Sequence, residues 1–463
     1  MAQISARRRI FGWMMFDWAS QPFYTLLLTF IFGPYFAGIA TQVFMDSGLS
    51  EAASDARAQS LWSLGQTVAG LLIAFSAPLL GAVADSTGRR LPWIVAFSLL
   101  FVGGTWALWW MVPDGSNMYQ SLFAFGVAMV GAEFALIFTN AMLPGLGDEA
   151  EVGGISGSGF ALGYAGGVTA LLIMLLLFHQ GDDGKTLIGL DPILGLDASR
   201  REGTRAVGPF TAVWYLLFMI PFFVWVKEGP PKRRTALGTA LSELKSSLAA
   251  ILRRRSLAAY LGSSMLYRDA LNALYAFGGV YATLVLDWSI TMIGIFGIIG
   301  AISAAVFSWI GGRVDRAYGP RPVIVSTIWM LIIVCVIIVG MTRDSILGVA
   351  LAPGSGLPDI VFFVLGAIIG AAGGALQASS RTMMVRHSDP SHPTQAFGFY
   401  ALSGKATAFL APALIGVVTF ITESPRLGLS PVIALFVVAL FIFRWVKAEG
   451  EQVEWAASPL PSY

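Results

Sequence analysis

Charged residues are scarce in this chain of 463 residues. Aspartate, glutamate, lysine and arginine make up 12% of it, about half of the roughly 25% that is usual in soluble domains. So few charges cannot cover the surface of a globular protein of this size. The formal net charge of +2 is also too small to indicate a polyanionic partner. The composition therefore argues against a soluble enzyme, a disordered protein and a nucleic-acid-binding protein.

Cysteine and histidine are rarer still. The single cysteine, Cys335, cannot form a disulfide within one chain. The three histidines have no metal-ligand spacing and lie near predicted helix ends, where a Ser/His/Asp catalytic site is not expected. We therefore expect neither catalytic activity nor a bound metal or other cofactor.

Apolar residues dominate instead, at 56% of the chain, and they gather in long runs. A membrane-spanning helix needs about 20 mostly apolar residues. Twelve segments meet this requirement: 11–41, 59–83, 92–112, 118–142, 155–179, 208–227, 257–286, 290–311, 323–341, 359–386, 395–420 and 428–447. The pattern predicts an all-α membrane protein with twelve transmembrane helices. The first segment is too long for one straight span, so we expect it to tilt or to extend past the membrane.

The basic residues predict the orientation. With a cytoplasmic N-terminus, 20 of the 29 lysines and arginines lie in segments predicted to be inside, and 7 lie in segments predicted to be outside. Cytoplasmic loops are enriched in lysine and arginine. We therefore predict that both termini are cytoplasmic, and we expect the membrane to be the bacterial inner membrane.

A short repeat divides the chain into two similar halves. The sequence GAVADSTGRR at residues 81–90 joins the second and third predicted helices, and GGRVDRAYGPR at residues 311–321 joins the eighth and ninth. Duplicated six-helix halves are typical of transporters. We predict an N-terminal half, a cytoplasmic linker, a C-terminal half and a cytoplasmic tail at residues 1–227, 228–256, 257–447 and 448–463. The linker contains an amphipathic helical pattern, which is either a tether between the halves or part of a solvated connection.

The repeated loop resembles the signature of the major facilitator superfamily, in which G-x-x-x-D-x-x-G-R-R joins the second and third helices. The continuation RRLPW at residues 89–93 also resembles the glycoside–cation symporters. Four further stretches, FDWASQPF (16–23), SGFALGYAGG (158–167), GGALQASSR (373–381) and FGFYALSGKA (397–406), are similar to the UMF1 family, which includes the Atg22-like vacuolar amino-acid effluxers of fungi. The resemblance implies a transporter that moves a small solute by alternating access, with the first, fourth, seventh and tenth helices lining the cavity.

Five charged residues lie well inside the predicted spans, away from their ends: Asp17, Glu133, Arg268, Asp269 and Lys405. A charge at the centre of a membrane helix costs about 2.5–3.5 kcal/mol, so such residues are functional candidates by default. With polar neighbours, the set expected to bind substrate or to couple transport is Asp17, Gln21, Glu133, Arg268, Asp269, Asn272, Gln377 and Lys405. Glu133 is the strongest candidate for proton coupling, because a carboxyl group in the apolar middle of a helix can exchange a proton near neutral pH.

Each of these residues also has a structural interpretation. Asp17 could be an interfacial carboxylate near a helix N-terminus, and Glu133 could form an ion pair with Arg268 or Lys405. Arg268 and Asp269 are adjacent and point about 100° apart on a helix, so each is expected to meet a partner on another helix. Arg381 lies nearer the predicted cytoplasmic end, where extension of its side chain to the membrane surface is the simpler explanation.

The repeated loops suggest a gate. In the fold that the resemblance implies, Asp85 lies near the start of the eleventh helix at residues 393–395 and Asp315 near the start of the fifth at residues 154–156, where free N–H groups at a helix N-terminus could bind each carboxylate. Arg89, Arg90 and Arg321 could pair with the acidic segment 148–151 or with lipid phosphate.

Glycines recur every four residues on two predicted helices, at 159, 163 and 167 and at 366, 370 and 374. Small residues at this spacing allow close helix packing.

Three functions remain open. The favoured one is a proton-coupled or facilitative carrier of a small polar, amino-acid-like solute that works as a monomer. A sugar–cation symporter is the first alternative. A non-transporting membrane sensor is the second, although the short predicted tails, 1–10 and 448–463, offer no signalling domain.

Overall fold

A computed structural model describes residues 4–181, 183–228, 248–249, 251, 253–288 and 290–457. Most of these residues are helical, and a small hairpin is formed by β1 (Ser345–Ile346) and β2 (Val349–Ala350), which pair antiparallel. Among the described residues, eleven helices or continuous helical runs are long and apolar enough to cross a membrane. The helix α11 (Arg255–Leu286) covers the remaining predicted segment and is 32 residues long, although it is not one of the eleven.

The described chain forms two compact units. Unit 1 comprises residues 1–76, 88–139 and 162–231, and unit 2 comprises 77–87, 140–161 and 232–463. Unit 2 thus takes two short pieces that the sequence assigns to the N-terminal half. The division into halves stays a prediction, and most of the predicted linker 228–256, with its amphipathic helix, lies outside the described residues.

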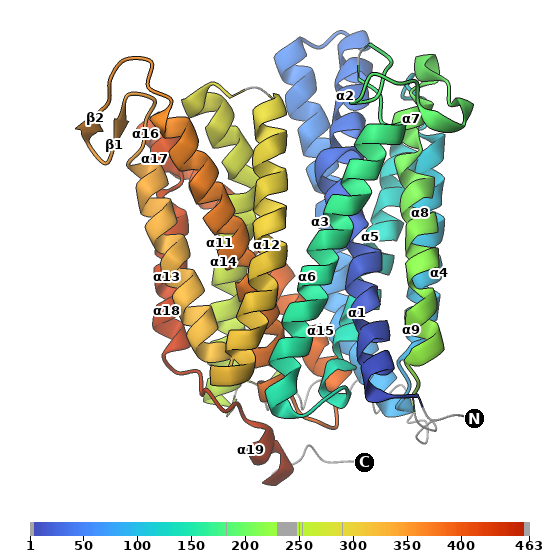
Figure 1. The fold of residues 1–463 in the computed structure, drawn as a ribbon, viewed down its shortest axis with the longest axis vertical. Coiled ribbons are helices and arrows are strands. Elements are labelled where there is room, and N and C mark those ends of the chain that lie inside the picture. The colour runs from blue at the N-terminus through green and yellow to red at the C-terminus, as the bar shows by residue number, and fades with distance from the viewer. Residues whose placement is uncertain are drawn as a thin grey trace. The chain divides into compact units, whose positions relative to one another are not determined.

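Unit 1 contains most of the first six predicted spans, and its helices are coloured from blue to green in Figure 1. Its helices, some of which continue into unit 2, are α1 (Ala6–Pro22), the π-helix η1 (Phe23–Phe30), α2 (Phe32–Asp46), α3 (Glu51–Thr87), α4 (Leu91–Ala107), α5 (Met118–Asn140), α6 (Glu149–Ile173), α7 (Glu202–Arg205), α8 (Val207–Phe218) and α9 (Ile220–Trp225). Short 3₁₀ or π-helical turns follow α4, α5 and α6 at Leu108–Trp110, Leu143–Gly145 and Met174–Phe178.

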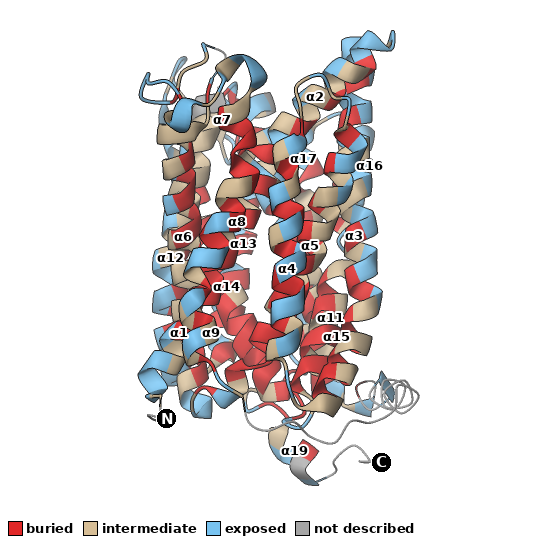
Figure 2. Cartoon of the chain, turned by 90° about the vertical axis from the view of Figure 1, so that its right-hand side faces the viewer, coloured by how far each residue is buried: buried red, intermediate tan, exposed pale blue. Residues whose placement is uncertain are grey.

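Unit 2 contains the end of α3, the start of α6 and all the later helices. These are α11, α12 (Ile290–Tyr318), α13 (Pro320–Val339), α14 (Leu357–His387), α15 (Pro393–Ala406), α16 (Leu410–Thr422), α17 (Pro425–Gly428), α18 (Ser430–Phe443) and α19 (Gln452–Ala457). The helix α14 packs against both α12 and α13, and most of its residues are buried (Figure 2).

Several predicted single spans are interrupted or change helix type, and prolines lie close to these places. The span predicted at 395–420 divides into α15 and α16, because Pro412 has no N–H and its ring clashes with the carbonyl four residues earlier, in the break at 407–409. In the span predicted at 11–41, α1 passes directly into the π-helix η1 after Pro22, and the interruption comes at Ile31, before α2. Pro22 cannot donate to the Trp18 carbonyl, and the Trp214 indole N–H donates to it instead at 3.2 Å.

The two glycine stripes pack against neighbouring helices as predicted. A Cβ atom added at Gly163 would lie 3.4 Å from the Asp17 Cβ on α1. In unit 2, a Cβ atom on Gly370 would overlap the backbone of Gly300 on α12, and one on Gly374 would lie 2.7 Å from the Ala304 carbonyl oxygen. Small residues therefore bring α6 close to α1 and α14 close to α12.

Candidate functional site

Asp85 binds the N-terminus of α15 within unit 2. Its side chain is buried, with 5% exposed. Thr394 Oγ1 donates to Asp85 Oδ1 at 2.6 Å, the Thr394 N–H donates to the same oxygen at 3.3 Å, and the Gln395 N–H donates to Oδ2 at 2.8 Å. Since α15 begins at Pro393, these backbone groups are unpaired donors of its first turn. This is the contact that the sequence predicts; a role in gating stays a prediction.

Asp315 occupies the corresponding position in the second copy of the repeat and lies beside α6. It is 1% exposed, and a Cβ atom added at Gly153 would lie 2.6 Å from its carboxyl carbon. Among the described residues, neither carboxylate oxygen has a hydrogen-bond partner within standard geometry. The predicted proximity to α6 is therefore present, but the predicted binding of free N–H groups is not.

Arg381 on α14 is buried, which corrects the interpretation that its side chain extends to the membrane surface. Only 2% of it is exposed. Its Nε donates to Ser156 Oγ at 2.9 Å, Nη2 donates to the Ser156 carbonyl at 2.8 Å, and Nη1 donates to Asn140 Oδ1 at 3.0 Å. Its guanidinium carbon also lies 4.4 Å from the centre of the Phe160 ring. Arg381 thus joins α14 to the end of α5 and the start of α6.

The loop arginines do not all make the predicted contacts. Arg321 lines a groove with residues of α13 and α18, and among the described residues it forms no ion pair with the acidic segment 148–151. Glu149 of that segment lies 3.4 Å from Arg386 Nε instead. At the start of α4, Glu228 accepts from the backbone N–H groups of Arg90 and Leu91 at 2.7 and 2.9 Å. Arg89 lies one residue before this capped turn.

In unit 1 the predicted polar residues lie near the π-helix η1. Asp17 is buried on α1, and Gln21 follows one turn later, with its Cγ 2.9 Å from where a Cβ atom on Gly167 would lie. Tyr24, in η1, directs its hydroxyl to Glu133 Oε1 of α5 at 3.5 Å. π-Helical turns inside longer helices occur frequently at functional sites. The structure therefore brings Asp17, Gln21 and Glu133 to neighbouring helices of one unit.

In unit 2, Arg268 and Asp269 each meet a different half of the broken span, as their adjacent positions predict. Arg268 Nη1 donates to the Tyr400 carbonyl on α15 at 2.9 Å, and its guanidinium carbon lies 4.2 Å from the Tyr400 ring centre. Asp269 accepts from the Ala411 N–H in the first turn of α16 at 2.9 Å. Asp269 therefore binds the start of α16 as Asp85 binds the start of α15.

Three further predicted residues lie on α15, α11 and α14. Lys405 lies in the last turn of α15, beside the break, and is partly exposed. Asn272 is exposed on α11. The Gln377 amide donates to the Gly373 carbonyl on its own helix, α14, at 3.3 Å. The structure places these residues on three helices of unit 2, and their part in binding stays a prediction.

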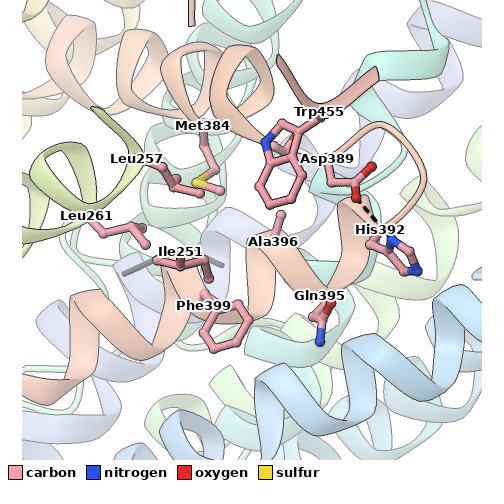
Figure 3. A pocket seen from close by; sticks show the side chains of 11 residues that line it. Ile251, Leu257, Leu261, Met384, Asp389, His392, Gln395, Ala396, Phe399 and Trp455 are labelled. Carbon is pink, nitrogen blue, oxygen red and sulfur yellow. Dashed lines mark hydrogen bonds and ion pairs between the residues drawn. The ribbon is translucent and has the colours of Figure 1, made fainter. Parts of the chain in front are cut away.

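The C-terminal segment packs against the connection between α14 and α15, which sequence reasoning did not predict. The Trp455 indole N–H donates to the His387 carbonyl at 2.9 Å, and the Arg254 guanidinium lies 3.7 Å from the Trp455 ring centre. Trp455 lines a small cavity with residues of this connection and of α15, among them Asp389, His392 and Gln395 (Figure 3). The segment after the last span is therefore an integral part of unit 2.

The fold is that of the major facilitator superfamily of transporters. The solved structure of the proton:xylose symporter XylE aligns with 97% of this chain and 98% of its own, with a TM-score of 0.68 and 12% sequence identity. The human organic anion transporter MFSD10 aligns with 95% of this chain and 100% of its own, with a TM-score of 0.67 and 16% identity. At such low identity the likeness shows the fold alone, and it confirms the predicted fold class.

The family profile described as "Vacuole effluxer Atg22 like" matches residues 5–456. The chain therefore belongs to the Atg22-like family of MFS-type transporters and is an integral, multi-pass membrane protein. The uncharacterized MFS-type transporter YxiO of Bacillus subtilis (strain 168) is 24% identical over 445 residues, which are 95% of this chain and 94% of YxiO. Autophagy-related protein 22 of Cryptococcus neoformans is 23% identical over 320 residues, 65% of this chain but 52% of the fungal protein. These findings confirm the resemblance seen in the sequence.

Proposed function

We propose that this protein moves a small polar, amino-acid-like solute across the membrane by alternating access, and that Glu133 is the group that couples transport to protons. The observation that carries the proposal is the hydrogen bond between Tyr24 and Glu133 at a π-helical turn within a membrane span. A charged side chain in a span is costly and by default functional.

Charges of both signs lie within the spans, which suits a zwitterionic substrate. Asp17 and Glu133 lie in spans of unit 1, and Arg268 and Lys405 lie in spans of unit 2. A sugar site needs aromatic and neutral polar groups rather than this number of charges. We therefore favour an amino-acid-like solute over a sugar.

The contacts of Asp85 and Arg381 act as closing contacts in this proposal. With both termini cytoplasmic, the end of α3 and the start of α15 face the cytoplasm. Asp85 then joins α3 to the first turn of α15, and Arg381 joins α14 to α5 and α6. Breaking these hydrogen bonds would be required for the solute path to open on that side.

The test is transport by the purified protein in liposomes. Exchange of internal and external solute (counterflow) is measured with labelled amino acids, and separately with sugars in the presence of sodium. Net uptake of the same solutes is then measured under an imposed pH gradient. We expect counterflow of at least one amino acid and accumulation that follows the pH gradient. Sodium-dependent sugar uptake without amino-acid counterflow would instead support a sugar–cation symporter, and no transport of either class would support a sensor.

Glu133→Gln separates coupling from binding. The amide keeps the size of the side chain but cannot exchange a proton, so we expect pH-driven accumulation to be lost while counterflow and expression persist. Glu51→Gln makes the same change at an exposed position in the first turn of α3 and serves as the control. Unchanged pH-driven accumulation in Glu133→Gln would remove Glu133 from the coupling mechanism.

A further inference from the structure

We propose that a groove between α13 and α18 binds one anionic phospholipid, whose phosphate is held by Arg321 and Arg444. The groove has a volume of about 390 Å³, which lies in the range of small-ligand sites. All its lining residues belong to unit 2. The proposal concerns the outside of the helix bundle and is independent of the transported solute.

The charge of the groove is entirely positive. None of its lining residues is acidic. Arg321 Nε is buried and has no hydrogen-bond partner among the described residues, while Arg444 is exposed and makes only a long contact, 6.0 Å, with the Phe441 ring. A planar guanidinium with unpaired donors binds phosphate oxygens well. The two arginines therefore favour an anionic group with several oxygen acceptors.

Both arginines lie where a lipid phosphate lies. Arg321 is the second residue of α13, and Arg444 directly follows the last residue of α18. The predicted topology puts the start of α13 and the end of α18 on the same, cytoplasmic, side of the membrane. Basic pockets between membrane helices on this side typically bind anionic headgroups.

The rest of the groove is apolar and fits a hydrocarbon chain rather than free phosphate. Trp329 and Phe441 are 53% and 55% exposed, and Val325 and Val437 lie beside them. Trp329 follows Arg321 by eight residues on α13, which corresponds to about 12 Å along the helix. Inorganic phosphate would leave this apolar surface uncovered, whereas the first part of an acyl chain would cover it.

The experiment uses the purified full-length protein after delipidation in detergent. Binding is measured as the increase in thermal unfolding temperature with added phosphatidylglycerol, phosphatidylcholine or inorganic phosphate, and bound lipid is counted by native mass spectrometry. We expect phosphatidylglycerol to stabilise the protein and to be retained, and the other two to have little effect. In Arg321→Gln/Arg444→Gln we expect the apparent affinity for phosphatidylglycerol to fall about tenfold or more, because both basic contacts are removed.

The control is Arg7→Gln/Arg8→Gln, which removes the same charge from exposed residues of α1 that the sequence predicts on the same side. It should keep wild-type affinity. If the double variant unfolds without lipid, the single variant Arg444→Gln, at an exposed position, is used in its place. The single variant should lose part of the affinity for phosphatidylglycerol. Equal affinity in the groove variants and the wild type, equal stabilisation by phosphatidylcholine, or full stabilisation by inorganic phosphate would each overturn the proposal.

Discussion

The two copies of the repeated loop have similar sequences but make different contacts. In both copies a glycine near the end of one helix lets another helix approach closely, and an aspartate follows four residues after Gly81 and three residues after Gly312. A Cβ atom on Gly81 would lie 2.7 Å from the Thr394 carbonyl oxygen of α15. One on Gly312 would lie 2.8 Å from the Gly157 Cα of α6. The helix crossing is therefore common to the two copies.

The aspartates differ because the helices that they meet begin at different points. The helix α15 begins at Pro393, so the N–H groups of Thr394 and Gln395 have no acceptor in the preceding turn and donate to Asp85. The helix α6 begins at Glu149, and Asp315 meets it at Gly153, where the N–H groups already serve the helix. A difference of one helical turn thus decides whether a buried carboxylate receives hydrogen bonds from backbone N–H groups at the start of a helix.

The largest effect should come from the crossings that the copies share. Gly81→Ala and Gly312→Ala each force a methyl group against backbone atoms that cannot move aside, so we expect each to lower the free energy of unfolding by about 2 kcal/mol. Thermal unfolding in detergent measures this. Gly262→Ala on α11, where no atom lies within 4 Å of the added Cβ, should be neutral or stabilising. A loss in only one of the two variants would show that the crossings are not equivalent.

The second largest effect should distinguish the first copy of the repeated loop, which contains Asp85, from the second copy, which contains Asp315. Asp85→Asn removes the charge that three donors share, and we expect a loss of about 1.5–2 kcal/mol in the free energy of unfolding, since hydrogen bonds to charged groups are the strong ones. If Asp85 also closes the gate, a cysteine placed at the buried Ala378 should react faster with maleimide in this variant, measured with Cys335 replaced by alanine. Thr394→Val removes one donor and should have a smaller effect. A stability equal to that of the wild type would mean that the hydrogen bonds to α15 contribute nothing.

Asp315→Asn should have the opposite sign. Asp315 is buried and, among the described residues, accepts no backbone N–H from the start of a helix; a buried carboxylate that is so little compensated is costly, so the neutral amide should leave the stability unchanged or raise it by up to about 1 kcal/mol. The same thermal unfolding assay, run beside Asp85→Asn, gives the comparison directly. If both variants lose stability equally, the two copies act alike despite their different geometry.

The sequence predicts much of this fold because the relevant signals are local. Long apolar runs define the spans, and the repeat identifies Asp85 as a residue that meets the start of α15. Prolines at 22 and 412 were visible in the sequence, but whether a proline bends a membrane helix or divides it depends on neighbours such as Trp214, which replaces the lost donor.

The other contacts depend on how helices that are distant in the sequence pack together, which no local sequence pattern predicts. A long side chain near a helix end can extend to the membrane surface or turn inward, and only the positions of Ser156 and Asn140 decide this for Arg381. Glu228 and Trp455 lie outside the apolar runs, and their partners are distant in the sequence. Their contacts could not be predicted before the helices were placed.

The smallest effect is expected in the two connections that precede α15 and α6. The connection before α15 contains Asp389, which accepts from the Ser391 N–H and Oγ at 2.8 and 2.6 Å and lies 3.3 Å from His392 Nδ1. Burial opposes ionisation of Asp389, but the hydrogen bonds from His392 and Ser391 outweigh it and lower its pKa below the ordinary value. Before α6, the corresponding link is a 3.4 Å contact from the Asp148 N–H to Glu151 Oε2, which is exposed.

Folding lowers the pKa of Asp389. Its ionised carboxylate therefore stabilises the fold at every pH above the pKa of an unfolded aspartate, about 4, and this contribution is lost as the pH falls through the lower pKa of the folded state. We therefore expect the thermal unfolding temperature of the wild type to exceed that of Asp389→Asn at pH 7, by a small margin that shrinks below about pH 4. Glu151→Gln, the matched change before α6, should show no such margin. A difference between the wild type and Asp389→Asn that stays constant from pH 7 to below pH 4 would mean that the charge of Asp389 does not stabilise the start of α15.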